Sequence, residues 1–163
     1  MEWWLQAFVW ILPAYVANMA PVFARGIKSP LAVPVDGRAV APDGKRWLGN
    51  GKTWQGLIAA VIAGALTGYA LPGCSASLGA FLGFWAIMGD MAGSFAKRRL
   101  GMPRGSKAGL LDSMDFITFA LVASVPFYPW ELKQLLLVLL ATPALHRGAN
   151  ILGYLLKLKD VPW

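Results

Sequence analysis

The sequence has little of what an ordinary soluble domain contains. Only 14% of its 163 residues are charged, whereas soluble domains carry about 25%. Its single cysteine excludes a disulfide framework and a cysteine-rich metal cluster. Hydrophobic residues make up 57% of the chain, and the mean hydropathy is +0.54. This composition predicts an integral membrane protein.

Uncharged runs predict five membrane-spanning helices and therefore an all-α fold. A helix needs about 20 apolar residues to cross a bilayer, and the run from Trp3 to Ala24 is long enough. The run from Thr53 to Gly89 is too long for one crossing and is broken by a turn-forming L-P-G-C-S segment. The fifth span requires the helix to continue through His146. The predicted spans cover residues 3–24, 54–71, 77–96, 110–129 and 132–156 of a single membrane-embedded domain, 1–163.

The distribution of positive charge predicts which side of the membrane each loop faces. The loop 25–53 contains six Lys and Arg residues and the loop 97–109 contains five, whereas the connections on the opposite side carry at most one. Because basic loops stay in the cytoplasm, we expect the N-terminus outside and the C-terminus in the cytoplasm. No basic segment precedes the first apolar run, so we expect a retained helix and not a cleaved signal peptide.

A polar stripe ends the third predicted span. Helical periodicity places Asp90, Ser94, Lys97 and Arg98 on one face, starting about two turns inside the basic end. An ionisable group at such a depth costs about 2.5–3.5 kcal/mol on insertion scales, so Asp90 needs a partner, a watery cavity or a metal ion. Two interpretations stay open. The stripe is a functional site, or Asp90 pairs with a neighbouring cation and only steadies the helix end.

Two more carboxylates stand where the fourth predicted span begins. Asp112 and Asp115 are three residues apart, so they share a helix face, where like charges repel. One aspartate in a first helical turn is explained by the helix dipole, but two of them together with Asp90 exceed that need. Carboxylate oxygens suit Mg²⁺, which usually takes one or two carboxylates plus substrate phosphates. The loop 101–107 between the two groups is rich in glycine and basic residues and is able to approach phosphate.

The start of the second predicted span has the features of an anion-binding helix terminus. The segment L-G-N-G-K-T-W-Q-G supplies Asn50 and Lys52, and Thr53 is placed to cap the helix. Backbone amides at a helix N-terminus attract anions, and Lys52 adds a cation. A P-loop is excluded, because that motif requires glycine where the chain has Arg46 and it follows a strand.

Three polar residues interrupt the fifth predicted span. His146 and Asn150 are four residues apart, and Arg147 lies beside them. Arg147 is suited to hold a lipid phosphate, and equally suited to extend its side chain to the membrane interface. The sequence assigns these residues no role.

Three motifs, in order, resemble those of a known family. Gly51 to Gly56 resembles the K-T-W-x-G element of the CDP-diacylglycerol synthase superfamily, and Gly89 to Arg98 resembles its G-D-x-x-x-S-x-x-K-R signature. Asp112 to Asp115 resembles the D-x-x-D that closes this signature. The small size and the five spans are most similar to the archaeal branch, the CDP-archaeol synthases.

This resemblance implies an Mg²⁺-dependent nucleotidyltransferase. Its partners would be CTP, an isoprenoid ether lipid phosphate (a bis-geranylgeranyl-glycerol phosphate) and the bilayer, with no nucleic acid. The active site would face the cytoplasm from the cell membrane. The bacterial members carry a K-D and an H-G-G group that residues 101–111 lack, so Asp90 would have to serve as the third metal carboxylate. The implied site comprises the metal ligands Asp90, Asp112 and Asp115, which are catalytic together with Lys97, and the nucleotide-binding residues Asn50, Lys52, Thr53, Ser94, Lys97 and Arg98.

Other classes of protein make different use of the same residues. Charged side chains within spans often mark ion paths, so a small transporter is the main alternative. Its charged groups are expected near mid-bilayer, whereas the three aspartates are predicted at the inner rim. A CDP-alcohol phosphotransferase is disfavoured, because its D-G-x-x-A-R pattern does not occur. A non-catalytic assembly factor would leave the three motifs unexplained.

Overall fold

The computed structural model describes every residue except 104, 160 and 163. The described part of the chain forms five α-helices and no named strand, as the sequence predicts. The helices are α1 (Trp3–Ala24), α2 (Trp54–Ala70), α3 (Ala76–Arg99), α4 (Leu110–Ser124) and α5 (Leu132–Leu155). The fifth helix does continue through His146.

The helices differ in their capacity to cross a bilayer. Among the described residues, α1, α3 and α5 are long and apolar enough to span, and α2 is an apolar helix of 17 residues. The predicted fourth span, 110–129, is shorter than expected, because α4 ends at Ser124. Proline at 126 has no N–H to continue the ladder, and the chain turns there with Phe127 N donating to Ser124 O at 2.9 Å. At about 1.5 Å per residue, the 15 residues of α4 extend about 22 Å, less than the hydrocarbon thickness.

Glycines allow α2 and α3 to pack with their backbones in contact. A Cβ placed on Gly79 would lie 2.2 Å from the carbonyl oxygen of Gly64 and 2.8 Å from the Cα of Gly68. On α2 these glycines recur every four residues and so form one face. Small residues at a helix interface are the usual means of close helix packing in membranes. The α2–α3 pair therefore forms a rigid support for the polar end of α3.

A buried cluster joins the remaining helices. It combines Ile11 of α1, Ala86 of α3, Phe116 and Ile117 of α4, and Val138 of α5, each at most 1% exposed. Polar bonds reinforce this cluster, since hydroxyls bond across membrane helices. The Tyr15 hydroxyl on α1 lies 2.6 Å from that of Thr142 on α5.

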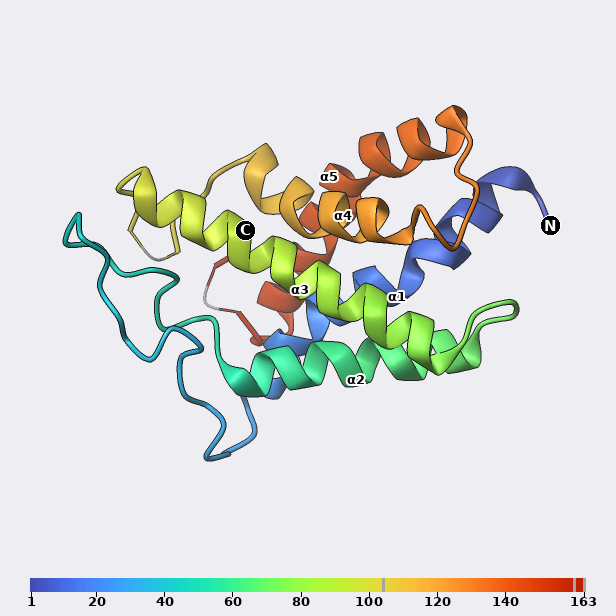
Figure 1. Cartoon of the computed structure of the whole chain (residues 1–163). Helices are drawn as coiled ribbons and strands as arrows, with labels where there is room; N and C mark the ends of the chain where they lie inside the picture. The colour runs from blue at the N-terminus through green and yellow to red at the C-terminus, as the bar shows by residue number, and fades with distance from the viewer. Residues whose placement is uncertain (104, 160, 163) are drawn as a thin grey trace.

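The loops divide between the two ends of the bundle. Figure 1 shows the segments 25–53 and 97–109 together at one end, on the left. The N-terminus, the α2–α3 turn and the α4–α5 turn lie at the other end, on the right. The two basic loops therefore lie at the same end of the bundle, as predicted, and which side of the membrane that end faces stays a prediction.

Candidate active site

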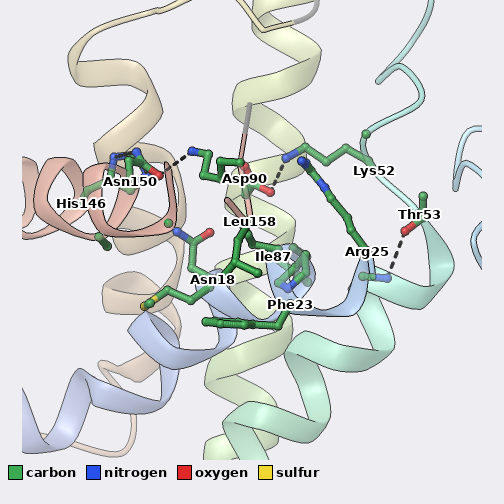
Figure 2. A pocket seen from close by; sticks show the side chains of 18 of the residues that line it. Asn18, Phe23, Arg25, Lys52, Thr53, Ile87, Asp90, His146, Asn150 and Leu158 are labelled. Atoms are coloured by element: carbon green, nitrogen blue, oxygen red, sulfur yellow. Dashed lines mark hydrogen bonds and ion pairs between the residues drawn. The ribbon is translucent and has the colours of Figure 1, made fainter. Parts of the chain in front are cut away.

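Two adjoining cavities open at the end of the bundle that carries the basic loops. The first has a volume of about 190 Å³ and is partly apolar, with Phe23, Leu57 and Ile87 among its lining residues (Figure 2). The second has a volume of about 500 Å³ and is more polar. Its charged or polar lining side chains are Arg25, Lys52, Asp90, Ser94, Lys97, Arg98, Ser106, Asp112, His146, Asn150 and Lys159.

The predicted stripe on α3 is the wall of the polar cavity. The helical period places its four residues on one face of α3, and all four line the cavity: Asp90, Ser94, Lys97 and Arg98. The last turn of α3 carries three basic residues at the negative end of its dipole, where cations are stabilised, so the helix continues to Arg99 and beyond the predicted boundary at 96. The stripe therefore lines a cavity, and the ion pair described for Asp90 is with Lys52 of another segment.

Lys52 reaches Asp90 from the segment just before α2. The Lys52 ammonium forms a hydrogen-bonded ion pair with the Asp90 carboxylate, and each side chain is about three-quarters buried. The capping expectation for Thr53 is confirmed, since its hydroxyl accepts from Gly56 N at 3.1 Å (Figure 2). The main chain at Lys52 is anchored as well, because its carbonyl accepts from Val35 N at 2.8 Å. Lys52 thus stands at a capped helix N-terminus and faces the carboxylate of α3.

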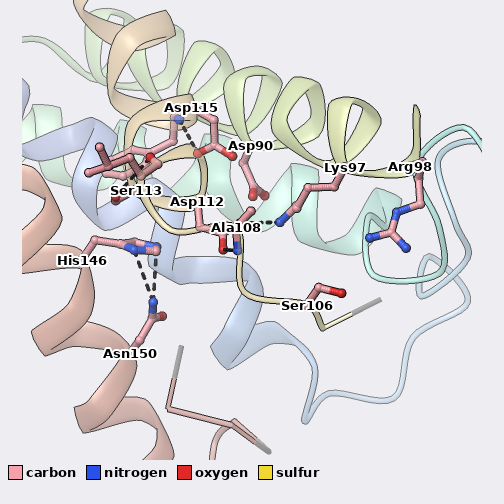
Figure 3. Close-up of polar contacts among 12 residues, drawn as sticks. Asp90, Lys97, Arg98, Ser106, Ala108, Asp112, Ser113, Asp115, His146 and Asn150 are labelled. Atoms are coloured by element: carbon pink, nitrogen blue, oxygen red, sulfur yellow. Dashed lines mark hydrogen bonds and ion pairs between the residues drawn. The ribbon is translucent and has the colours of Figure 1, made fainter. Parts of the chain in front are cut away.

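A second ion pair joins α3 to α4. Lys97 Nζ lies 2.5 Å from an Asp112 carboxylate oxygen, and the other oxygen accepts from Ala108 N at 2.7 Å (Figure 3). The carboxylate thereby ties the end of the loop 101–109 to the first turn of α4. The Arg98 Nη2 group bonds the Pro103 carbonyl at 3.2 Å, whereas its buried Nε finds no partner among the described residues.

Asp115 is held against α3 by close helix packing. A Cβ placed on Gly89 would lie 2.3 Å from the main-chain carbonyl oxygen of Asp115. A Cβ placed on Gly93 would lie 2.0 Å from the Asp115 Oδ2 atom. Only glycine at both positions lets α4 approach this near. Figure 3 shows the carboxylates of Asp115 and Asp90 on the same side of α3, close enough for their charges to repel.

The loop before α2 is built around one buried carboxylate. The Asp36 side chain, 3% exposed, accepts from Arg46 Nη2 at 2.6 Å and from the amides of Leu48 and Gly49 at 3.0 and 3.1 Å. Burial acts to raise the pKa of Asp36, but these bonds outweigh it and lower the pKa to about 2. The carboxylate is therefore ionised at neutral pH and fixes the approach to Lys52.

Asn50 lies outside the polar cavity. Its side-chain oxygen accepts from Arg46 Nη1 at 2.9 Å, and it lines a separate hollow next to Arg98 and Met102. The structure thus brings Lys52, Asp90, Ser94, Lys97, Arg98 and Asp112 to the polar cavity. Thr53 lines the smaller cavity and Asn50 the neighbouring hollow, and Asp115 is not among the described lining residues of any of the three.

Sequence reasoning missed two cations of the site. Arg25 directly follows α1, and from the sequence its charge indicates only which side of the membrane the loop faces. In the structure, Arg25 and Lys159 both line the two cavities. Lys159 Nζ donates to Asn150 Oδ1 at 2.6 Å, and the Asn150 amide nitrogen lies 3.3 Å from Nδ1 of His146. Arg147 instead lines a hollow between α4 and α5. No sequence pattern distinguishes Lys159 from Lys157, because both alternate with leucine.

The donor groups can be compared with the needs of Mg²⁺. Among the residues that the structure describes, no group of three or more Asp, Glu, His or Cys side chains converges on one point. Asp90 and Asp115 nevertheless repel each other in a half-buried setting, and a divalent cation relieves such repulsion. One or two carboxylates completed by substrate phosphates are the usual Mg²⁺ set. The residues therefore fit Mg²⁺ together with a nucleotide, and the ligand set of Asp90, Asp112 and Asp115 stays a prediction.

The charge of the polar cavity defines the ligand it accepts. Five basic side chains line it against two carboxylates, each of which is paired with a lysine. Such an excess of hydrogen-bond donors suits polyphosphate. The fold and this cavity define a polytopic helical membrane protein with a cationic cavity at one end of the helix bundle, next to a partly apolar cavity.

Known proteins match this chain along nearly its whole length. The family model described as CarS-like, CDP-archaeol synthase, matches residues 1–163. The CDP-archaeol synthase of Aeropyrum pernix is 43% identical over 98% of this chain and 92% of its own. That of Thermococcus kodakarensis is 38% identical over 98% and 99%. The chain belongs to the CDP-archaeol synthase family.

A solved structure shares the fold. It is described as an intramembrane enzyme for archaeal membrane lipid biosynthesis and is 40% identical to this chain. The two superpose with a TM-score of 0.78 over 91% of this chain and 94% of the other. The family and this neighbour are enzymes of lipid synthesis, so the transporter alternative is not favoured.

Proposed function

We propose that the protein transfers the cytidylyl group of CTP to the phosphate of an isoprenoid ether lipid, giving a CDP-archaeol-type lipid and pyrophosphate. The observation that carries this proposal is the junction of two cavities, one cationic and one partly apolar, around Lys52 and Asp90. A nucleotide triphosphate suits the first, and a lipid headgroup with its adjoining chains suits the second. Membership of the CDP-archaeol synthase family supports the same reaction.

The reaction needs positioning and charge neutralisation more than proton transfer. A lipid phosphate is already ionised at neutral pH, so its oxygen attacks the α-phosphorus of CTP without a strong general base. A new P–O bond forms, and the bond from the α-phosphorus to the bridging oxygen of the β-phosphate breaks. Pyrophosphate leaves with that oxygen and its electron pair. A catalytic serine triad or a nucleophilic cysteine is therefore not required.

The basic side chains of the polar cavity supply the neutralising charge. Lys97 and Arg98 lie in the last turn of α3 and line the polar cavity, and we assign them to the β- and γ-phosphates. Lys52 and the capped N-terminus of α2 face Asp90 and are assigned to the α-phosphate. On CTP binding, Lys97 and Lys52 exchange part of their carboxylate contacts for phosphate oxygens.

Mg²⁺ is proposed as the cofactor, held by Asp90 with Asp112 and Asp115. When bound, it would neutralise charge on the nucleotide phosphates and on the leaving pyrophosphate. The chain's own contribution is to fix these carboxylates. The Asp115 side chain packs against Gly93, which leaves room for it, and the amide N–H of Ala108 donates to the Asp112 carboxylate and orients it.

The membrane placement follows the charge. We propose that the protein lies in the cell membrane with its N-terminus outside and with the active site, loops 25–53 and 97–109 and the C-terminus facing the cytoplasm. CTP then reaches the cavity from the water, and the lipid acceptor reaches it from the bilayer.

The test uses the purified protein in detergent with labelled CTP, Mg²⁺ and a panel of lipid phosphates. We expect a CDP-lipid from the unsaturated isoprenoid ether acceptor, and none when Mg²⁺ is chelated. Asp112→Asn and Asp115→Asn should abolish turnover while the melting temperature stays within a few degrees of the parent. Near-normal product from both variants would reject the site. Ion flux in liposomes without CTP, and no CDP-lipid, would favour a transporter instead.

A further inference from the structure

The chain after α5 folds back into the site. Lys157 takes a left-handed conformation with φ 58°, and Leu158 N donates to Gly153 O at 2.9 Å while Lys157 N donates to Tyr154 O at 2.9 Å. These two bonds form the Schellman ending of a helix, here with lysine where glycine is usual. The reversal places Lys159 between the two cavities, with its ammonium on Asn150. A residue near the end of the sequence thus becomes part of the site wall.

Lys159 and Arg25 line the same two cavities, where the Arg25 side chain is exposed. Lys159 is half-buried, and burial followed by the charge of Arg25 lowers its pKa. Two cationic side chains that line one cavity attract an anion, and a charge-assisted hydrogen bond is strongest from the half-buried one. Figure 2 shows Arg25 extending from the end of α1 toward the same region as Lys52 and Asp90. The geometry is that of an anion site bounded by α1, α2 and the tail.

The position relative to the cavities distinguishes this anion from the nucleotide. Of these two cavities, Lys97 and Arg98 line only the polar one, whereas Arg25 and Lys159 line both. On the side of the smaller cavity, Phe23, Leu152, Leu156 and Leu158 provide an apolar wall next to the two cations. An anion that carries hydrocarbon chains fits a position between two cations and an apolar wall. The triphosphate of a nucleotide has no hydrocarbon to pack against such a wall.

We propose that Arg25 and Lys159 bind the phosphate of the lipid acceptor, so that the turn after α5 brings a substrate-binding side chain to the site. This inference rests on the proposed cytidylyl transfer. Asn150 orients Lys159, and the shared boundary places the acceptor oxygen next to Lys52, where the α-phosphate is assigned. His146 supports Asn150 and acts through it as a positioning residue.

The experiment compares KM for the two substrates in four variants. Lys159→Gln and Arg25→Gln should each raise KM for the lipid phosphate about 10-fold or more, the effect of losing a charge-assisted hydrogen bond. Their KM for CTP should stay within about 2-fold. Lys159→Arg keeps the charge and should retain most of the affinity. Lys157→Gln is the matched control, because Lys157 is exposed and lines none of the described cavities.

The outcomes separate this inference from the proposed function. A parent protein that makes no CDP-lipid contradicts the proposed function. In that case, binding of a short-chain dialkylglycerol phosphate in detergent by the parent and by Lys159→Gln still tests the site. Equal binding, or a variant whose KM rises for CTP alone, overturns the inference. If Arg25→Gln does not fold, Lys159→Gln and Lys159→Arg decide the question.

Discussion

Replacing Gly93 by alanine tests whether the position of Asp115 matters for catalysis. The new Cβ would lie 2.0 Å from Asp115 Oδ2, 2.8 Å from its Cγ and 2.9 Å from its Cβ. Because the whole side chain is in contact, a rotation cannot relieve the overlap, and the carboxylate has to move by about 1 Å or more. A displacement of that size at a reacting centre costs about 100-fold in rate, and the added methyl group costs about 1–3 kcal/mol of stability.

The assay is kcat for CDP-lipid formation, with the melting temperature measured on the same samples. Gly148→Ala is the matched control, since a Cβ on Gly148 meets nothing within 4 Å on the same kind of helical backbone. It should keep the parent's rate. Asp115→Asn preserves the packing and should lose turnover without the loss of stability. A Gly93→Ala enzyme that turns over at the parent's rate would refute the assignment of Asp115 to the reacting centre.

Three further predictions concern the nucleotide, the loop and the helix contact. Lys97→Ala should raise KM for CTP more than KM for the lipid in steady-state kinetics; a selective loss of lipid affinity would move Lys97 to the acceptor. Because the folded pKa of Asp36, about 2, lies below its ordinary 3.8, its bonds stabilise the protein above pH 3.8 and are lost as the pH falls towards 2. The melting temperature should fall through that window, and Asp36→Asn should be less stable than the parent at pH 7 but nearly equal to it at pH 2; an equal difference at both pH values argues against this role. Gly79→Ala should lower stability by about 1–3 kcal/mol in thermal melts, since its Cβ would meet the Gly64 carbonyl at 2.2 Å, and an unchanged melting temperature would contradict the close α2–α3 packing.

The helices were predictable because charge is excluded from apolar spans. Uncharged runs predicted the bounds of α1 and α2 to within about one residue. The end of α4 was predicted wrongly, since hydropathy continues past Ser124 although the main chain turns before Pro126. Apolar composition alone does not reveal where a proline stops the hydrogen-bond ladder.

The site was predictable only where its residues share one helix. The period of α3 correctly grouped Asp90, Ser94, Lys97 and Arg98 on one cavity wall. The pairing of Lys52 with Asp90 depends on the path of the loop 25–53, which no periodic pattern encodes. Arg25 and Lys159 come from the two ends of the sequence, and only the tertiary fold joins them.

One measurement tests the central claim most directly: the fate of label from CTP in the presence of the lipid phosphate and Mg²⁺. With CTP labelled at the α-phosphorus, the account predicts that the label appears in the lipid product. With CTP labelled at the γ-phosphorus, it predicts that the label appears only in pyrophosphate. Label from the γ-phosphorus in the lipid, or no transfer from either position, would contradict cytidylyl transfer at this site.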